Sequence, residues 1–147
     1  MSKLANGFTL IELMVVVAIL AIVVALGYPS YRDQVMKARR SEAMGELLEL
    51  ADRLERYYAD QGTYCADAPD CTGATLGAAE SDIYPTTTEG GYYALSITAQ
   101  DDITFSLQAA PVAGKSQAKD KCGTFTLTSL GNKGISGGSL TVKDCWK

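Results

Sequence analysis

The sequence contains no histidine, and its 147 residues include a single tryptophan. The absence of histidine excludes Ser-His-Asp triads, Cys-His dyads, and zinc or haem sites that use an imidazole ligand. It also removes the commonest general base, so most familiar enzyme sites are excluded before any motif is considered. We therefore expect a protein that is not an enzyme and that needs neither a cofactor nor a metal.

Basic residues are missing from residues 61–102, a stretch that carries seven acidic residues. Residues 103–147 are the opposite, because they hold six lysines against two aspartates. Such asymmetry between blocks favours complementary surfaces in an assembly, or a local face that binds anions. The ordinary alternative is a solvated surface with uneven charge.

One apolar stretch dominates the hydropathy pattern, because 18 of the 21 residues from Phe8 to Tyr28 are apolar. A helix of this length reaches roughly 31 Å, which matches the hydrocarbon core of a bilayer. A secretory signal would have a shorter apolar run followed by a small-x-small cleavage site, and the stretch continues instead into Tyr28-Pro29-Ser30. We therefore expect residues 8–28 to form a membrane-spanning helix whose only charge is Glu12.

The residues before and inside this stretch form a recognisable motif, Gly7-Phe8-Thr9-Leu10-Ile11-Glu12 followed by Leu13-Met14. It resembles the prepilin signature of the type IV pilin and pseudopilin superfamily. The resemblance implies that residues 1–7 are a leader, that a prepilin peptidase cleaves between Gly7 and Phe8, and that the new Phe8 amine is methylated. It also implies that the helix first anchors the protein in the bacterial inner membrane and then, through the pilus assembly machinery, joins other pilin subunits in the filament core.

Glu12 is costly inside a membrane or a filament core unless it is paired, so its presence indicates a partner. The family pattern places this glutamate against the amino terminus of a neighbouring subunit, which would give assembly its register. The alternative is that Glu12 lies one turn from the start of the helix and reaches the interface with its carboxylate.

Two signals for membrane orientation disagree. Arg32, Lys37, Arg39 and Arg40 follow the span, whereas Lys3 and the amino terminus precede it, so a count of basic residues places the carboxyl side in the cytoplasm. Four cysteines after residue 60 favour a disulfide-permissive compartment instead. We follow the cysteines and the leader, which predict a single-pass protein with a periplasmic C-terminal domain and a later location in an extracellular pilus.

Residues 29–61 are predicted to continue the helix as an amphipathic segment. Apolar residues recur there at a spacing of three to four, from Met36 through Leu47 to Leu54, and Gly62 is a suitable C-terminal cap. Gly27 and Pro29 weaken the helix between its two halves, because glycine is a poor helix former and proline removes a backbone donor. We expect a kink or hinge at these two residues.

The remainder is predicted to be a long loop followed by a sheet. Residues 62–91 show little periodicity and form the expected loop between helix and sheet. Alternating apolar residues predict strands near 93–98, 103–109 and 124–128, and Leu140-Thr141-Val142 predicts a fourth short strand. The predicted fold class is α+β, with a long N-terminal helix whose amphipathic half packs on a four-stranded antiparallel sheet formed within residues 92–147.

The four cysteines, Cys65, Cys71, Cys122 and Cys145, allow three disulfide pairings. A tetracysteine zinc site is disfavoured, because the spacings are unlike the usual close pairs. The C-terminal residues, with Cys122-Gly-Thr-Phe-Thr-Leu and Asp144-Cys145-Trp146, resemble the end of PilE-type minor pilins. That resemblance, which implies a disulfide-bounded C-terminal region, favours the pairs Cys65–Cys71 and Cys122–Cys145.

Three functions fit these features. The first is a structural subunit, with the character of a minor pilin, of a type IV pilus used for twitching motility and cell adhesion. The second is a pilin that binds DNA for natural transformation, through a patch that would contain Lys115, Lys119, Lys121, Lys133 and Lys143. The third is a pseudopilin of type II secretion. Asp67 with Asp70, and Asp101 with Asp102, fit turns better than carboxylate pairs or calcium ligands.

Overall fold

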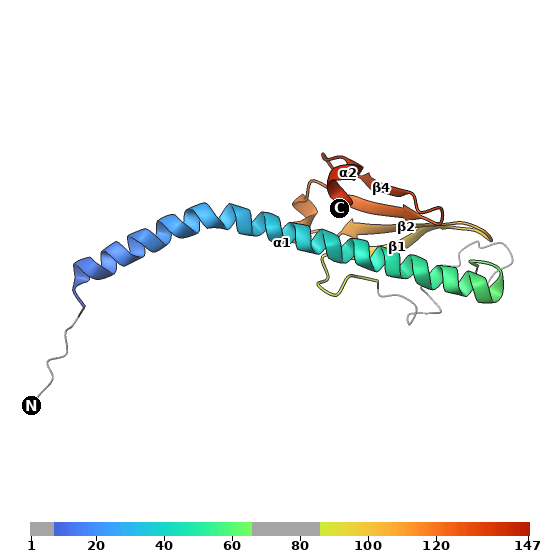
Figure 1. Ribbon diagram of the computed structural model, residues 1–147, viewed down its shortest axis with the longest axis horizontal. Coiled ribbons are helices and arrows are strands. Elements are labelled where there is room, and N and C mark those ends of the chain that lie inside the picture. The colour runs from blue at the N-terminus through green and yellow to red at the C-terminus, as the bar shows by residue number, and fades with distance from the viewer. Residues whose placement is uncertain (1–7, 66–85) are drawn as a thin grey trace, which may run out of the picture. The chain divides into compact units, whose positions relative to one another are not determined.

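The computed structural model describes residues 8–65 and 86–147. The chain forms two compact units, one ending at Val35 and the other comprising Met36–Lys147. Its elements are, in order, α1 (Leu10–Gln61), β1 (Tyr93–Gln100), β2 (Phe105–Pro111), the 3-10 helix η1 (Ser116–Lys119), β3 (Thr124–Thr128), β4 (Lys133–Ser136) and α2 (Val142–Cys145) (Figure 1). The predicted α+β class is confirmed: the fold is a long N-terminal helix with a four-stranded antiparallel sheet.

The first half of α1 exposes its side chains throughout. Every residue from Phe8 to Gln34 is exposed, including large apolar ones such as Leu20 and Val24. By length and composition, α1 contains a stretch able to cross a membrane, and none of that stretch is buried within the protein. Within the described residues nothing covers this apolar surface, which favours cover by a membrane or by other molecules.

The helix continues through the two residues expected to weaken it. Gly27 and Pro29 both lie inside α1, which is helical from Leu10 to Gln61. A proline in a helix interior removes one backbone hydrogen bond but does not have to end the helix, because its neighbours keep theirs. The helix is therefore continuous through Gly27 and Pro29. The hinge at these two residues stays a prediction.

The second half of α1 buries one face in the Met36–Lys147 unit. The buried residues follow the predicted spacing of three to four: Ala43, Met44, Leu47, Leu50 and Leu54. The helix ends as expected, because Gly62 has a φ of 74° and its N–H donates to the Tyr58 carbonyl at 2.7 Å. Glycine adopts this left-handed conformation without steric cost, so the predicted C-terminal cap is confirmed.

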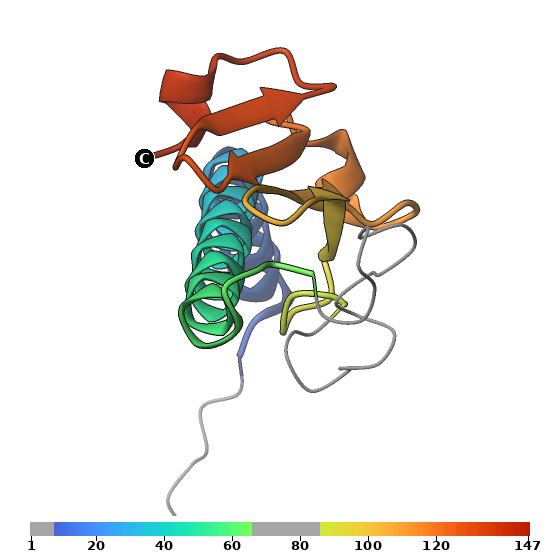
Figure 2. The ribbon, with the colours of Figure 1, turned by 90° about the vertical axis from the view of Figure 1, so that its right-hand side faces the viewer.

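The strands form an antiparallel meander in the order β1-β2-β3-β4. Seen along α1, the sheet lies to one side of the second half of the helix (Figure 2). Register partners such as Leu107 and Leu127, or Ala109 and Phe125, direct alternate side chains to the same face. These side chains join the helix leucines in one core, whose largest fully buried members include Tyr93, Phe105 and Phe125.

The position of the fourth strand was predicted wrongly. The segment expected to be a strand, Leu140-Thr141-Val142, instead leads into α2, and the fourth strand is β4 at Lys133–Ser136. Thr141 caps α2 through a capping box, in which its side chain accepts from the Asp144 N–H while the Asp144 carboxylate accepts from the Thr141 N–H. This local pairing of side chain and backbone outweighs the β propensity of two residues.

The C-terminal residues are fixed to this sheet. Cys122 and Cys145 form a disulfide. The Trp146 indole N–H donates to the Gly134 carbonyl of β4 at 2.9 Å, and its ring packs edge-on against Phe125. Trp146 is therefore packed against the sheet.

Candidate functional site

The start of α1 places Glu12 in the first helical turn. Thr9 precedes the helix and acts as its N-terminal cap, with its hydroxyl accepting from the Glu12 N–H at 3.3 Å and its carbonyl accepting from the Leu13 N–H at 3.2 Å. A carboxylate in a first turn interacts favourably with the positive end of the helix dipole. Glu12 is exposed on this helix, so its carboxylate can receive a cation from another chain.

The processing residues lie at the edge of the described chain. Phe8 is exposed and begins the described part, whereas Gly7 and the rest of the predicted leader lie outside the described residues. Among the ion pairs of the described residues, none includes Glu12. Within the described residues the Glu12 carboxylate is therefore not used in an ion pair.

A second arrangement of interest connects α1 to the β2–β3 connection. Arg40 donates from Nε to Asp120 Oδ2 at 2.8 Å and from a terminal nitrogen to Asp120 Oδ1, which makes a forked ion pair. The Asp120 side chain is fully buried and that of Arg40 nearly so. Tyr93 donates to the same carboxylate at 3.3 Å, and Gln117 donates to the Tyr93 hydroxyl at 2.9 Å. Burial is the main cause that raises the pKa of Tyr93, so this hydroxyl stays protonated and keeps its role as donor.

This network brings several basic residues to one end of the Met36–Lys147 unit. The 3-10 helix η1 is held against the beginning of that unit by Gln117, which donates to the Met36 carbonyl at 3.5 Å, and by Arg39, which donates to Ser116 at 2.7 Å. The disulfide brings α2 to the same end. Lys37, Arg40 and Lys147 line one depression. Lys119 and Lys121 flank Asp120, the partner of Arg40, and Lys143 belongs to α2, which the disulfide joins to Cys122. We call these six residues the basic end.

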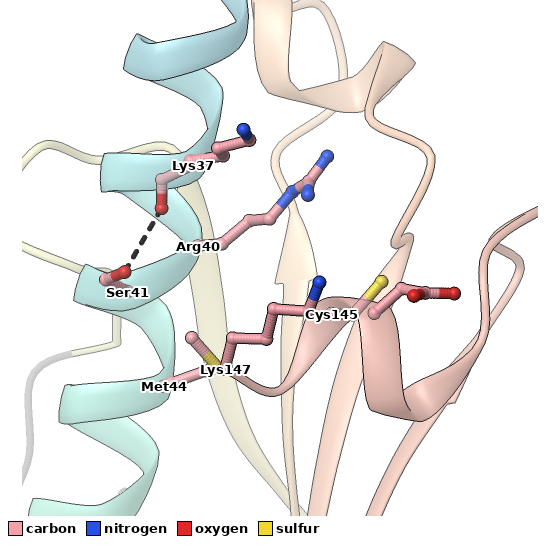
Figure 3. A pocket seen from close by; sticks show the side chains of 7 residues that line it. Lys37, Arg40, Ser41, Met44, Cys145 and Lys147 are labelled. Atoms are coloured by element: carbon pink, nitrogen blue, oxygen red, sulfur yellow. Dashed lines mark hydrogen bonds between the residues drawn. The ribbon is translucent and has the colours of Figure 1, made fainter.

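A depression of about 200 Å³ lies within the basic end. Its walls include Lys37, Arg40 and Met44 from α1 and Cys145 and Lys147 from the C-terminus (Figure 3). The Ser41 hydroxyl at its rim donates to the Lys37 carbonyl at 3.2 Å. Asp144 also lines it, but the carboxylate is engaged in capping α2, and the hydrogen bonds from Thr141 lower its pKa.

The structure divides the five lysines that were predicted to form one patch. Lys119, Lys121 and Lys143 belong to the basic end and are exposed. Lys115 instead donates to the Gly91 carbonyl at 2.6 Å and lies 5.2 Å from the Tyr92 ring centre. Lys133 lies on β4, and its Nζ is 5.2 Å from the centre of the Trp146 ring.

Sequence reasoning missed the contribution of α1 to this surface. Lys37 and Arg40 were considered only for membrane orientation. The signal for Arg40 was present, because it lies four residues after Met36 and four before Met44, on the edge of the buried face. Its partner, Asp120, is distant in sequence and carried no signal of its own.

The remaining predicted sites have separate outcomes. Cys65 is disulfide-bonded, and Cys71 lies outside the described residues, as do Asp67 and Asp70. Asp101 belongs to the β1–β2 turn, where it accepts from the Ile103 and Thr104 backbone N–H groups at 2.9 and 2.6 Å. These bonds and the Thr104 hydroxyl lower the pKa of Asp101, as expected for an aspartate that stabilises a turn. Among the described residues, no cluster of acidic or cysteine side chains could hold a metal ion.

Comparison with known proteins relates these features to one family. Residues 29–126 match the family described as "Type IV minor pilin ComP, DNA uptake sequence receptor", and residues 2–28 match the prokaryotic N-terminal methylation motif. The type IV major fimbrial protein FimA of Dichelobacter nodosus is 33% identical over 97% of this chain and 77% of its own length. A fimbrial protein of Pseudomonas aeruginosa is 30% identical over 99% of this chain and 92% of its own.

A structural relative agrees with this assignment. The crystal structure of the non-core minor pilin PilV of Neisseria meningitidis superposes with a TM-score of 0.54 at 22% identity, covering 74% of this chain and 94% of that one. The similarity at this identity concerns the fold alone. Together, the N-terminal motif, the fold and the full-length relatives show that the chain belongs to the type IV pilin family.

Proposed function

We propose that this pilin is a minor subunit of a type IV pilus, inserted by the first half of α1 in the inner membrane and then assembled into the filament. Pilins are structural, non-enzymatic subunits. The observation that carries the proposal is the apolar first half of α1, which is exposed from Phe8 to Gln34 and has no cover within its own unit. A bilayer satisfies this surface before assembly, and the helices of other subunits satisfy it afterwards.

The proposal assigns a role to each N-terminal residue. Prepilin peptidase cleaves between Gly7 and Phe8, and the Phe8 amine is methylated. Glu12 of one subunit then pairs with the amine of a neighbour, so that a carboxylate exposed in the single chain becomes neutralised on docking. The C-terminal unit is periplasmic before assembly and reaches the cell surface in the pilus, where it contributes to twitching motility and adhesion.

The minor status draws support from the ComP-type match, which is described as a minor pilin, although relatives such as FimA are major subunits. Quantitative mass spectrometry of filaments sheared from cells tests it. We expect a form that begins at methylated Phe8 and is a trace component of the filaments. A dominant form would make the protein the major subunit. Absence from filaments despite processing in the membrane would favour a pseudopilin, and a chain that begins at Met1 would refute the assignment of the leader.

We propose DNA binding as a second candidate function, because the matched family is described as a DNA uptake sequence receptor and the basic end presents several exposed lysines. Phosphate contacts of this kind weaken steeply with salt. Gel retardation of duplex DNA by the full chain in detergent should therefore appear at low salt and decrease at moderate salt. Absence of retardation at both salt concentrations would remove this function.

A further inference from the structure

The basic end has more positive charge than folding requires. The two aspartate side chains beside it are already engaged, Asp120 with Arg40 and Asp144 with the cap of α2. The five lysines, Lys37, Lys119, Lys121, Lys143 and Lys147, are all exposed. None of these lysines belongs to an ion pair among the described residues. Because like charges gathered on one surface repel each other, the cluster is best stabilised by an anionic partner.

The position of this cluster in the chain indicates which anion it meets. The Met36–Lys147 unit begins eight residues after Tyr28, the last residue of the apolar stretch, and eight helical steps advance the backbone by about 12 Å. The basic end contains Lys37 and Arg40, which are among the first residues of that unit. The headgroup layer extends roughly 5–7 Å beyond the hydrocarbon core, so the start of the unit lies within a Debye length of about 10 Å of the headgroups. Over this distance anionic lipid surfaces attract basic residues that follow a membrane span.

We propose that the basic end binds the phosphate headgroups of anionic lipids on the membrane that holds the first half of α1. This inference rests on the proposed membrane-inserted state. The contact would dock the C-terminal unit on the bilayer surface until the subunit enters a filament. It also gives a role to the basic residues after the span, whose number conflicts with the predicted orientation: they are held by the headgroups of the leaflet on the C-terminal side.

The aromatic residues near the lysines favour lipid over single-stranded nucleic acid as the partner. Stacking on exposed rings supplies much of the affinity for single-stranded nucleic acid. Tyr92 already carries the Arg39 guanidinium 3.5 Å from its ring centre, with Lys115 5.2 Å from the same centre. Trp146 is committed to Gly134 and Phe125. The basic end is therefore a surface of flexible ammonium groups, which suits headgroups in many geometries.

Trp146 provides the readout, because it is the only tryptophan and follows the disulfide-bonded Cys145 of the basic end. The full chain is reconstituted in vesicles of phosphatidylcholine alone, and in vesicles in which part of the lipid is replaced by phosphatidylglycerol. Quenching of Trp146 fluorescence by a spin label on a trace of the headgroups reports its approach to the surface. We expect about twofold stronger quenching with phosphatidylglycerol, and loss of the difference at high salt.

A pair of variants separates the basic end from charge in general. Lys119→Gln with Lys121→Gln removes two charges from the basic end and should abolish the phosphatidylglycerol effect. Arg53→Gln with Arg56→Gln removes two charges from the later turns of α1 and should leave the effect unchanged. Circular dichroism and melting temperature check that both double variants fold as the parent does.

Other outcomes would overturn the inference. Equal quenching in the two kinds of vesicle, or an equal loss in both double variants, contradicts headgroup binding. If quenching does not respond to lipid while duplex DNA binds with dependence on Lys119 and Lys121, the basic end is a DNA surface instead. Flotation of the vesicles after a carbonate wash tests insertion separately: failure to float refutes the membrane-inserted subunit, whereas flotation without a lipid effect refutes only headgroup binding.

Discussion

The two halves of α1 differ in how their apolar side chains are covered. Both are helical and rich in apolar residues, but the first half exposes all of its apolar side chains, whereas the second buries Leu47, Leu50 and Leu54 against its own sheet. A helix that is apolar all round is stable only inside a membrane or an assembly, and an amphipathic one needs cover on a single face. In one helix, the first half thus needs other molecules to cover its apolar side chains, whereas the second half buries its own against the sheet.

The largest expected effect is that of a substitution in the first half of α1. Glu12→Ala should leave membrane insertion intact, because the apolar stretch is unchanged, but should reduce entry into filaments by about a hundredfold or more, since an unpaired amine left in a filament core costs about 3–5 kcal/mol. Quantitative immunoblots of sheared filaments and of membranes measure both. Asp33→Ala is the matched control, because it removes a carboxylate from the same helix beyond the apolar stretch. Wild-type levels of the Glu12 variant in filaments would refute the assembly role.

For the second half of α1, the largest effect is expected at its contact with the sheet. Leu47→Ala removes a side chain with 0% exposure and should lower the unfolding free energy by about 3–4 kcal/mol through lost burial and a cavity. Its neighbour Leu48 is 48% exposed, so Leu48→Ala should cost less than about 1 kcal/mol. Denaturant unfolding in detergent, followed by Trp146 fluorescence, compares the two. Similar losses at both positions would mean that α1 does not pack as described.

Removal of the C-terminal disulfide should have a comparable or slightly smaller effect. The double variant Cys122→Ser with Cys145→Ser opens a loop with a sequence separation of 23 and should cost about 3 kcal/mol. Thermal unfolding measures the loss, and vesicle flotation should remain normal because the first half of α1 is untouched. A melting temperature equal to that of the parent under oxidising conditions would contradict this estimate of its contribution.

The smallest effect is expected at alkaline pH. Burial, followed by the hydrogen bond to Glu55, raises the pKa of Tyr64 to about 12 from its ordinary value of 10.0. The folded protein therefore retains this proton at pH values where the unfolded chain has lost it, so stability is lost as the pH rises from about 10 towards 12. Ultraviolet titration of phenolate absorbance should show late-ionising tyrosines, one of which is lost in Tyr64→Phe, while the late ionisation of the buried Tyr93 remains. An unchanged titration curve in that variant would assign the late ionisation to another tyrosine.

The sequence predicted those features that depend on local periodicity. The two characters of the helix, the cap at Gly62 and the first three strands each follow from residue spacing within one segment. The fourth strand could not be predicted in this way, because the choice between Lys133–Ser136 and Leu140–Val142 depends on a capping box and on pairing with β3. The ion pair between Arg40 and Asp120 was also beyond reach, since it joins residues 80 positions apart.

The candidate site shows the same limit. The motif from Gly7 to Glu12 was visible because its residues are contiguous. Only part of the basic end could be predicted from the sequence. Lys119, Lys121 and Lys143 belong to one basic C-terminal block of the sequence. Lys37 and Arg40 are distant from that block in sequence and join it only in the folded chain. Lys115 and Lys133 have the same charge but different neighbours, and only the structure separates them from the others.

The hydrogen bond from Trp146 to the Gly134 carbonyl has a consequence for crowding. Gly134 lies on β4, an outer strand of the sheet, and the indole occupies an acceptor that an incoming strand would use. At the opposite edge, Thr86 and Thr88 bond to the backbone of β1 through Leu95 and Tyr93. A subunit packed among other pilins thereby avoids pairing with them strand to strand, and association is left to its other surfaces.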